Sequence, residues 1–318
     1  MLSFRLTPTP PFRLDLTAWV LRRRPNNGWD LWDGETYRRV LVIEGVAVEM
    51  SVAQLRDKLV VEISGPRIPS RAKEQAIAAL RRLLGIDVGL SAFYRFARSD
   101  RRLAQLAERF HGFKPPRFLS VFESLVNGIT CQQLSLTVGI ILLNRLVEHY
   151  GRTLSGGHAF PEPNDLSSLD PEELVLLGYS HNKARSLIEL AQAIGDTRFH
   201  LASLEDANNN EALASLQQLR GIGRWTAEYV LLRGLGRTNV FPGDDVGARN
   251  NLEKWLGLRK PLTYDSAQRV LKRWAPFGGL IYFHLLLDQQ EGLGYLNQPP
   301  EQKGPADRKL AARGPRIL

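Results

Sequence analysis

The chain has 318 residues, which is enough for two or three domains with a sizeable core. Its 42 Lys and Arg side chains exceed its 33 Asp and Glu side chains, so the net charge of +9 favours a polyanionic partner without naming one. The single cysteine excludes an internal disulfide and a four-cysteine iron–sulfur cluster, and no apolar run reaches the ~18 residues of a membrane span. Because the N-terminus also lacks the apolar core of a signal peptide, we expect a soluble intracellular protein.

Residues 1–90 are predicted to form a mixed α/β unit. Segments 37–43, 46–52 and 58–63 are candidate strands because they are rich in β-branched residues. Apolar positions within 67–84 predict an amphipathic helix that covers the sheet. The segment around Trp19 fits either a strand or a short helix. We expect this unit to act as a structural brace.

From Ser91 onward the pattern is helical. Residues 118–129 have the spacing of an amphipathic helix, and Ser135 is the expected N-cap of the next helix, which ends at Tyr150. Gln132-Gln133, between these helices, is either a hydrogen-bonded junction or a functional element. Further helix starts are predicted at Asp170-Pro171, at Ser180 and after Asn208. The arginines are expected on solvated faces, with a subset available for phosphates; they are at positions 95, 98, 101, 102, 109 and 117.

No spacing of His and Cys residues predicts a metal site. His158, His181 and His200 are not at ligand spacing, and His284, on an apolar helix, is expected to be a hydrogen-bonded core histidine. Cys131 is expected to be a small buried hydrophobe, because no neighbouring His or Asn marks it as activated.

Gly221-Ile222-Gly223 separates two helical patterns and predicts a tight hairpin. The hairpin needs two glycines, because only glycine accepts the positive φ angles and lets foreign backbone approach closely. The second helix would begin just after Gly223, so its free N–H groups and positive dipole end would form an anion site suited to phosphate.

Asp244 and Asp245 belong to a Pro-Gly-Asp-Asp turn that opens the next helix. Two adjacent acids at a helix start allow a division of roles. We expect Asp244 to cap the helix and the other carboxylate to face a cleft. The alternative is that both acids only cap.

The run LRGIGRWTA and the acidic turn 22 residues after Gly223 together resemble the HhH-GPD superfamily of DNA glycosylases, with most similarity to the 3-methyladenine DNA glycosylase II (AlkA) type. The resemblance implies an α+β fold. Residues 1–90 would form a small antiparallel, TBP-like sheet with helices, and residues 91–298 an all-α HhH-GPD fold of two subdomains with the active site in the cleft between them. Residues 299–318 are expected to be a basic flexible tail.

This resemblance implies a monofunctional DNA glycosylase of base excision repair that flips an alkylated purine such as 3-methyladenine and hydrolyses its N-glycosidic bond. Asp245 is then the catalytic carboxylate, beside the positive charge that develops on the sugar. Trp225 stands where glycosylase/lyase relatives have a lysine, so no imine can form. Trp225 and Tyr229 share a helix face and, with Tyr282, would line a base pocket that attracts cationic purines; in the alternative they only pack. Leu286 replaces a late pocket tryptophan of the AlkA type.

The resemblance also assigns DNA contacts. Gln133 would be the wedge that fills the place of the flipped base, where the AlkA type has leucine. The hairpin would hold phosphate through Gly221, Gly223, Arg224 and Thr226, and its backbone carbonyls at Gln217, Leu219 and Ile222 would hold a monovalent cation, Na⁺ or K⁺. No other cofactor and no iron–sulfur cluster is expected.

The expected partner is double-stranded DNA with a damaged base, with no membrane. The protein is expected to be a monomer, cytoplasmic at the nucleoid, or nuclear in a eukaryote. Two other functions stay open. A bifunctional oxidised-base glycosylase/lyase is disfavoured by the missing lysine, and a non-catalytic HhH DNA-binding protein by Asp245, Trp225 and Tyr229.

Overall fold

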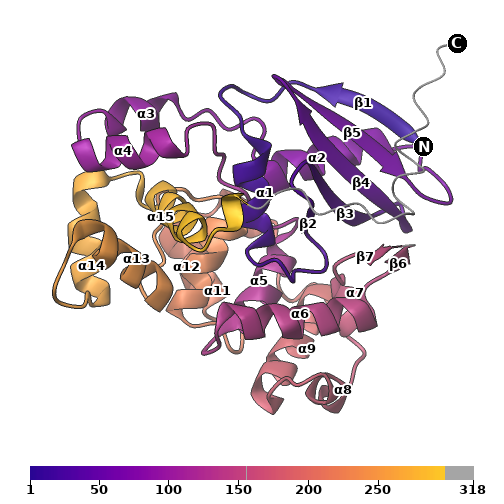
Figure 1. Ribbon diagram of the computed structural model, residues 1–318. Helices are drawn as coiled ribbons and strands as arrows, with labels where there is room; N and C mark the ends of the chain where they lie inside the picture. The colour runs from indigo at the N-terminus through magenta and orange to yellow at the C-terminus, as the bar shows by residue number, and fades with distance from the viewer. Residues whose placement is uncertain (155, 298–318) are drawn as a thin grey trace, which may run out of the picture.

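The computed structural model describes residues 1–154 and 156–297, and its N-terminal part is a five-stranded antiparallel sheet (Figure 1). The strand order is β1-β5-β4-β3-β2, with β1 at Leu2–Leu6, β2 at Leu31–Trp32, β3 at Thr36–Ile43, β4 at Val46–Leu55 and β5 at Lys58–Ser64. Ile43 pairs with Val46, so the β3–β4 hairpin has a two-residue turn, Glu44-Gly45, with φ of 48° and 75°. Such positive φ angles match the twist of the flanking strands.

The three predicted strands are confirmed, and the structure adds β1 and β2. The predicted helix over 67–84 is α2 (Ala72–Leu84), which begins later because Pro66 and Pro69 precede it. The segment around Trp19 is a helix, α1 (Leu14–Arg22). Both helices share a buried core with one face of the sheet.

The rest of the described chain is helical apart from a short hairpin of β6 (Thr153–Leu154) and β7 (Gly157–His158). The helices are α3 (Ser91–Ala97), α4 (Arg101–Arg109), α5 (Val121–Cys131), α6 (Leu136–Tyr150), α7 (Pro163–Leu166), α8 (Pro171–Leu176), α9 (His181–Gly195), α10 (Ser203–Asp206), α11 (Asn209–Leu216), α12 (Arg224–Arg233), α13 (Val246–Leu256), α14 (Tyr264–Leu271) and α15 (Gly278–Gly292). Ser135, Asp170, Ser180 and Asn208 cap the helices that the sequence predicted.

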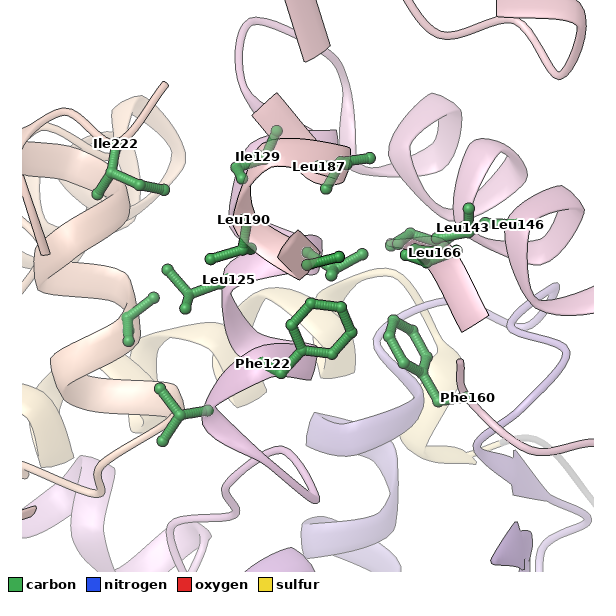
Figure 2. Close-up of a cluster of buried hydrophobic side chains, with 14 of the residues drawn as sticks. Phe122, Leu125, Ile129, Leu143, Leu146, Phe160, Leu166, Leu187, Leu190 and Ile222 are labelled. Atoms are coloured by element: carbon green, nitrogen blue, oxygen red, sulfur yellow. The ribbon is translucent and has the colours of Figure 1, made fainter. Parts of the chain in front are cut away.

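Two helical lobes share α12. One lobe has its core between α5, α6, α9 and α11, where Phe122, Leu125, Leu143 and Leu187 converge (Figure 2). The other lobe packs α3, α4 and α13–α15 around Phe93, Phe283 and Trp274, and α1 extends into it. The expected fold class, a small antiparallel sheet followed by a two-lobed helical part, is confirmed.

A buried ion network joins the sheet to the first lobe. Arg39 on β3 donates to Asp30 Oδ1 at 2.8 Å and to Glu123 Oε2, on α5, at 2.6 Å. All three side chains are buried, so breaking one pair would leave an uncompensated charge. The N-terminal unit is therefore fixed to the helical part, as a brace requires.

The described chain ends with a short 3₁₀ turn, Tyr295–Asn297, in which Tyr295 stacks on Trp19 at 5.5 Å between ring centroids. The predicted tail, 299–318, lies outside the described residues. Within the described part, no helix combines the length and the apolar character that a membrane crossing requires.

Candidate active site

A cleft of about 1130 Å³ opens between the two lobes at the start of α12. Its walls come from the α11–α12 hairpin and α12 itself, the turn before α6, the turn before α13, α15, and the residues that follow α1. The predicted site residues Gln133, Gln217, Leu219, Gly221, Ile222, Gly223, Arg224, Trp225, Thr226, Tyr229, Asp245 and Tyr282 all line it. The tertiary structure thus brings together residues that are separated by up to 149 positions.

The two hairpin glycines have different reasons to be glycine. Gly221 has φ of +78°, and a Cβ there would lie 2.6 Å from Ser186 Oγ, so only glycine fits. Gly223 has φ of −89°, and a Cβ there would meet no atom of the described residues within 4 Å. The prediction that both glycines need positive φ is therefore wrong for Gly223. Its exposed position at the N-cap of α12, without a side-chain cap, leaves room for a close approach from outside.

The turn before α6 is hydrogen-bonded to the hairpin. Gln132 Nε2 donates to the Gly221 carbonyl at 2.7 Å and to Thr226 Oγ1 at 2.8 Å. Lys183 Nζ, from α9, donates to the carbonyls of Thr130 and Gln132 at 2.8 and 2.7 Å. The wedge candidate and the predicted phosphate site therefore belong to one connected unit. The predicted alternative of a hydrogen-bonded junction is confirmed for Gln132, whereas Lys183 was not assigned a role from the sequence.

This arrangement changes the role of one predicted DNA contact. Thr226 is 1% exposed and its hydroxyl accepts from Gln132, so its side chain cannot reach DNA. Only its backbone N–H, in the first turn of α12, is left for that role.

Gln133 stands at the tip of the turn. It is exposed and has φ of +54°, a left-handed conformation that costs free energy for a non-glycine residue. The following Leu134 is 38% exposed. A strained, exposed tip at the rim of a cleft is suited to insertion into a partner, and Gln133 as the wedge stays a prediction.

The acidic turn contradicts the predicted division of roles. Asp245, not Asp244, is the N-cap of α13: its Oδ1 accepts from the Ala248 N–H at 2.9 Å. Its Oδ2 accepts from the indole N–H of Trp225 at 3.3 Å. Asp244 instead pairs with Arg224, with Nε to Oδ2 at 2.6 Å. The turn places Asp245 directly before the first helical residue, so this one carboxylate both caps and lines the cleft.

A clamp on α12 holds the acidic turn. Glu228 is 5% exposed and accepts from the Gly243 N–H at 3.1 Å and from the Tyr264 hydroxyl at 2.7 Å. Burial raises the pKa of Glu228. Arg224 lies over the Tyr264 ring, 3.7 Å from its centroid. The predicted DNA contact Arg224 is thus already engaged by Asp244 and Tyr264. Glu228 was not predicted from the sequence, although a carboxylate inside the apolar run TAEYVLL indicates a buried, hydrogen-bonded acid.

Aromatic rings form the wall beside the carboxylate. Trp225 and Tyr229 are stacked, with centroids 5.7 Å apart and an interplanar angle of 22°. Tyr282 from α15 completes the wall, and burial raises its pKa. Phe283, the next residue on α15, is fully buried and packs against Tyr282, so it is not part of this wall. Leu286 lines the cleft where an aromatic ring would have fitted the family pattern.

The comparisons with known proteins fall on these elements. Residues 126–276 match the HhH-GPD superfamily base excision DNA repair protein family, and residues 3–120 match the AlkA N-terminal domain. The chain belongs to the HhH-GPD superfamily. The first match includes the turn before α6, the α11–α12 hairpin and the acidic turn before α13. The second match includes the sheet, α1 and α2.

Two relatives and a solved structure illustrate the similarity. A DNA-3-methyladenine glycosylase of Bacillus subtilis is 26% identical over 75% of this chain and 80% of its own length. The E. coli DNA-3-methyladenine glycosylase 2 is 30% identical over 58% of this chain and 63% of its own length. The structure of a 3-methyladenine DNA glycosylase from Archaeoglobus fulgidus is 27% identical, with a TM-score of 0.79 over 90% of this chain and 98% of that one. The chain spans only 45% of the longer Mycobacterium tuberculosis relative that it matches.

The predicted cation site of this HhH-GPD chain stays a prediction. The Leu219 carbonyl accepts from the Ile222 N–H at 3.2 Å, which leaves its second lone pair available. Among the described residues, no group of three or more His, Cys, Asp or Glu side chains could hold a metal ion. Cys131 is only partly buried and lines the cleft, so the prediction of a buried residue is wrong for it. Desolvation raises the pKa of its thiol, which disfavours the reactive thiolate.

Of three buried basic side chains, one was predicted and two were missed. His284 is a buried core histidine that bonds the Leu280 carbonyl through Nδ1 at 2.7 Å, as predicted, but its Nε2 has no partner within the described residues. Arg23 and Arg233 line the cleft and were not predicted. Arg233 continues the i, i+4 row of Trp225 and Tyr229, a signal that could have revealed it, whereas nothing in the sequence places Arg23 there.

Proposed function

We propose that the protein is a monofunctional DNA glycosylase, which binds duplex DNA as a monomer, flips an alkylated purine such as 3-methyladenine, and hydrolyses its N-glycosidic bond. One observation carries the proposal. A carboxylate, Asp245, is fixed at the edge of an aromatic pocket, and the pocket residue next to it, Trp225, has no amine. The names of the relatives support the substrate class.

The two oxygens of Asp245 give the carboxylate a defined direction. Oδ1 is held by the first turn of α13, and among the described residues Oδ2 receives only the long Trp225 contact at 3.3 Å. Oδ2 can therefore face a flipped sugar. When the C1′–N bond breaks, its electron pair stays on the base, and the positive charge on C1′ is stabilised by Oδ2. Water then adds its oxygen to C1′ and gives a proton to Asp245.

The base would lie against Trp225 and Tyr229. Stacked aromatic faces attract an electron-poor, positively charged ring, which is what an alkylated purine is. The unit of hairpin and wedge turn would hold one strand through phosphate while Gln133 occupies the vacated stack. A solved complex of the Schizosaccharomyces pombe 3-methyladenine glycosylase with abasic DNA, 26% identical with a TM-score of 0.53, supports DNA as the partner.

The test is base release from a panel of duplex oligonucleotides, each with one defined lesion, followed by alkaline cleavage at the abasic site. We expect release of alkylated purines and no covalent adduct when borohydride is added. An adduct trapped by borohydride would show a lyase, and no release from any substrate would show a non-catalytic DNA-binding protein.

A further inference from the structure

Two buried arginines lie beneath the aromatic wall of the cleft. Arg233 is the last residue of α12, one turn beyond Tyr229, and Arg23 directly follows α1; their exposed fractions are 1% and 3%. Both line the cleft. They share the Phe118 ring, whose centroid is 5.2 Å from Arg23 Cζ and 4.9 Å from Arg233 Cζ. Arg23 has φ of +61°, so its backbone is held in a conformation that costs free energy.

Neither arginine has a carboxylate partner in the part of the chain that the structure describes. Arg23 Nη2 donates to Asn127 Oδ1 at 2.7 Å, and Arg233 Nη2 donates to the Val20 carbonyl at 3.1 Å. The Nε and Nη1 groups of both have no hydrogen-bond partner there. Arg39, in contrast, is held by two carboxylates. Because an unpaired buried charge is costly, this part of the cleft is suited to a ligand that gains negative charge.

We infer that Arg23 and Arg233 stabilise the negative charge that moves onto the base as it departs, and that they extend the pocket to neutral purines, which leave as anions. This inference rests on the proposed function. The C1′–N bond breaks with its electron pair on the base nitrogen, water supplies the oxygen to C1′ and a proton to Asp245, and the released base anion takes a proton from solvent. Because the unpartnered N–H groups are enclosed, the arginines act through their charge.

The charge of the substrate base determines how much the two arginines change kcat/KM. A neutral base goes from no charge to a partial negative charge in the transition state, so positive charge beneath it raises kcat/KM. A cationic alkylated base is attracted by the aromatic wall but repelled by the two arginines when it binds, and it loses its charge in the transition state. The arginines therefore add little to kcat/KM for that class.

The test compares release of hypoxanthine, a neutral base, with release of 7-methylguanine, a cationic one, by the full chain. In Arg23→Met we expect kcat/KM for hypoxanthine to fall about tenfold, and that for 7-methylguanine to stay within about twofold. Arg23→Lys keeps the charge, so it should restore most of the wild-type ratio between kcat/KM for hypoxanthine and kcat/KM for 7-methylguanine. Asn127→Ala, which removes the hydrogen-bond acceptor of Arg23 but not its charge, should leave the ratio unchanged.

Equal losses for both bases, or a change of the ratio in Asn127→Ala, would overturn the inference and leave the proposed function standing. Release of neither base by the wild-type chain would instead overturn the proposed function. If Arg23→Met does not fold, inhibition of the wild-type chain by free purines of opposite charge tests the role of the arginines instead. The xanthine anion should inhibit at least about tenfold more strongly than the 7,9-dimethylguanine cation, and the opposite order would refute the role of the arginines.

Discussion

Replacing Asp245 by Asn tests the chemistry and the cap of the same carboxylate separately. Asn is as good an N-cap as Asp, so its Oδ1 can keep the bond from the Ala248 N–H. Its amide N–H₂ then faces the indole N–H of Trp225, and the 3.3 Å contact between Trp225 and Asp245 is lost. One hydrogen bond contributes about 1 kcal/mol, so we expect the melting temperature to fall by roughly 2–4 °C.

The effect on catalysis should be far larger. Removal of one preorganised electrostatic contact costs about 10²–10³ in rate, and the loss of a proton acceptor for water adds to it. We therefore expect Asp245→Asn to slow base release by at least about 10³ under single-turnover conditions. Binding to lesion-bearing duplex should persist or strengthen, because a negative charge near the phosphates is removed.

Asp244→Asn is the matched control. Asp244 pairs with Arg224, and both side chains are partly exposed, so this ion pair contributes no more than about 1 kcal/mol. We expect release to stay within about tenfold of the wild-type rate and the melting temperature to change little. The catalytic role of Asp245 is refuted if Asp245→Asn remains active while Asp244→Asn loses base release. Equal activity of both variants would mean that neither carboxylate acts in the reaction.

Three further predictions concern the hairpin, the wedge and the core. Gly223→Ala should leave the melting temperature unchanged but weaken binding to undamaged duplex by roughly tenfold, which corresponds to about one charge-assisted hydrogen bond. Gly89→Ala, at an equally open site, is the control and should change neither the melting temperature nor the affinity. If Gly223→Ala binds the duplex as tightly as the wild type, the hairpin is not the phosphate site. Gln133→Ala should slow release from duplex by about tenfold and from single strands by less than about twofold, since only the duplex must be unstacked; equal effects would contradict the wedge. Burial lowers the pKa of His284 from 6.5 to about 4. The folded state therefore has its full stability above pH 6.5 and loses up to roughly 3 kcal/mol of it as the pH falls towards 4, because the buried ring must then take up a proton. Thermal melting across this pH range should show the loss for the wild type and a smaller loss for His284→Leu.

Local signals in the sequence were sufficient for the elements and for the order of the site residues. Capping by Ser135, Asp170 and Ser180 depends on one side chain and the next three residues, so it can be predicted without the fold. The Gly221 turn is also a local signal, because its φ of +78° strongly favours glycine. The spacing of the hairpin and the acidic turn was specific enough to indicate the superfamily, and the family matches confirm it.

The tertiary structure alone decided which groups face each other in the cleft. Sequence position could not tell which of two adjacent acids caps α13, because that depends on how the turn meets the helix; the result is Asp245. Nor could it show that Gln132 connects the wedge turn to the hairpin, or that Arg23, from a run of three arginines, lies buried beside the pocket. Hydrophobic periodicity reports which face of a helix is buried, but the direction and charge environment of a buried polar side chain depend on residues that are distant in the sequence.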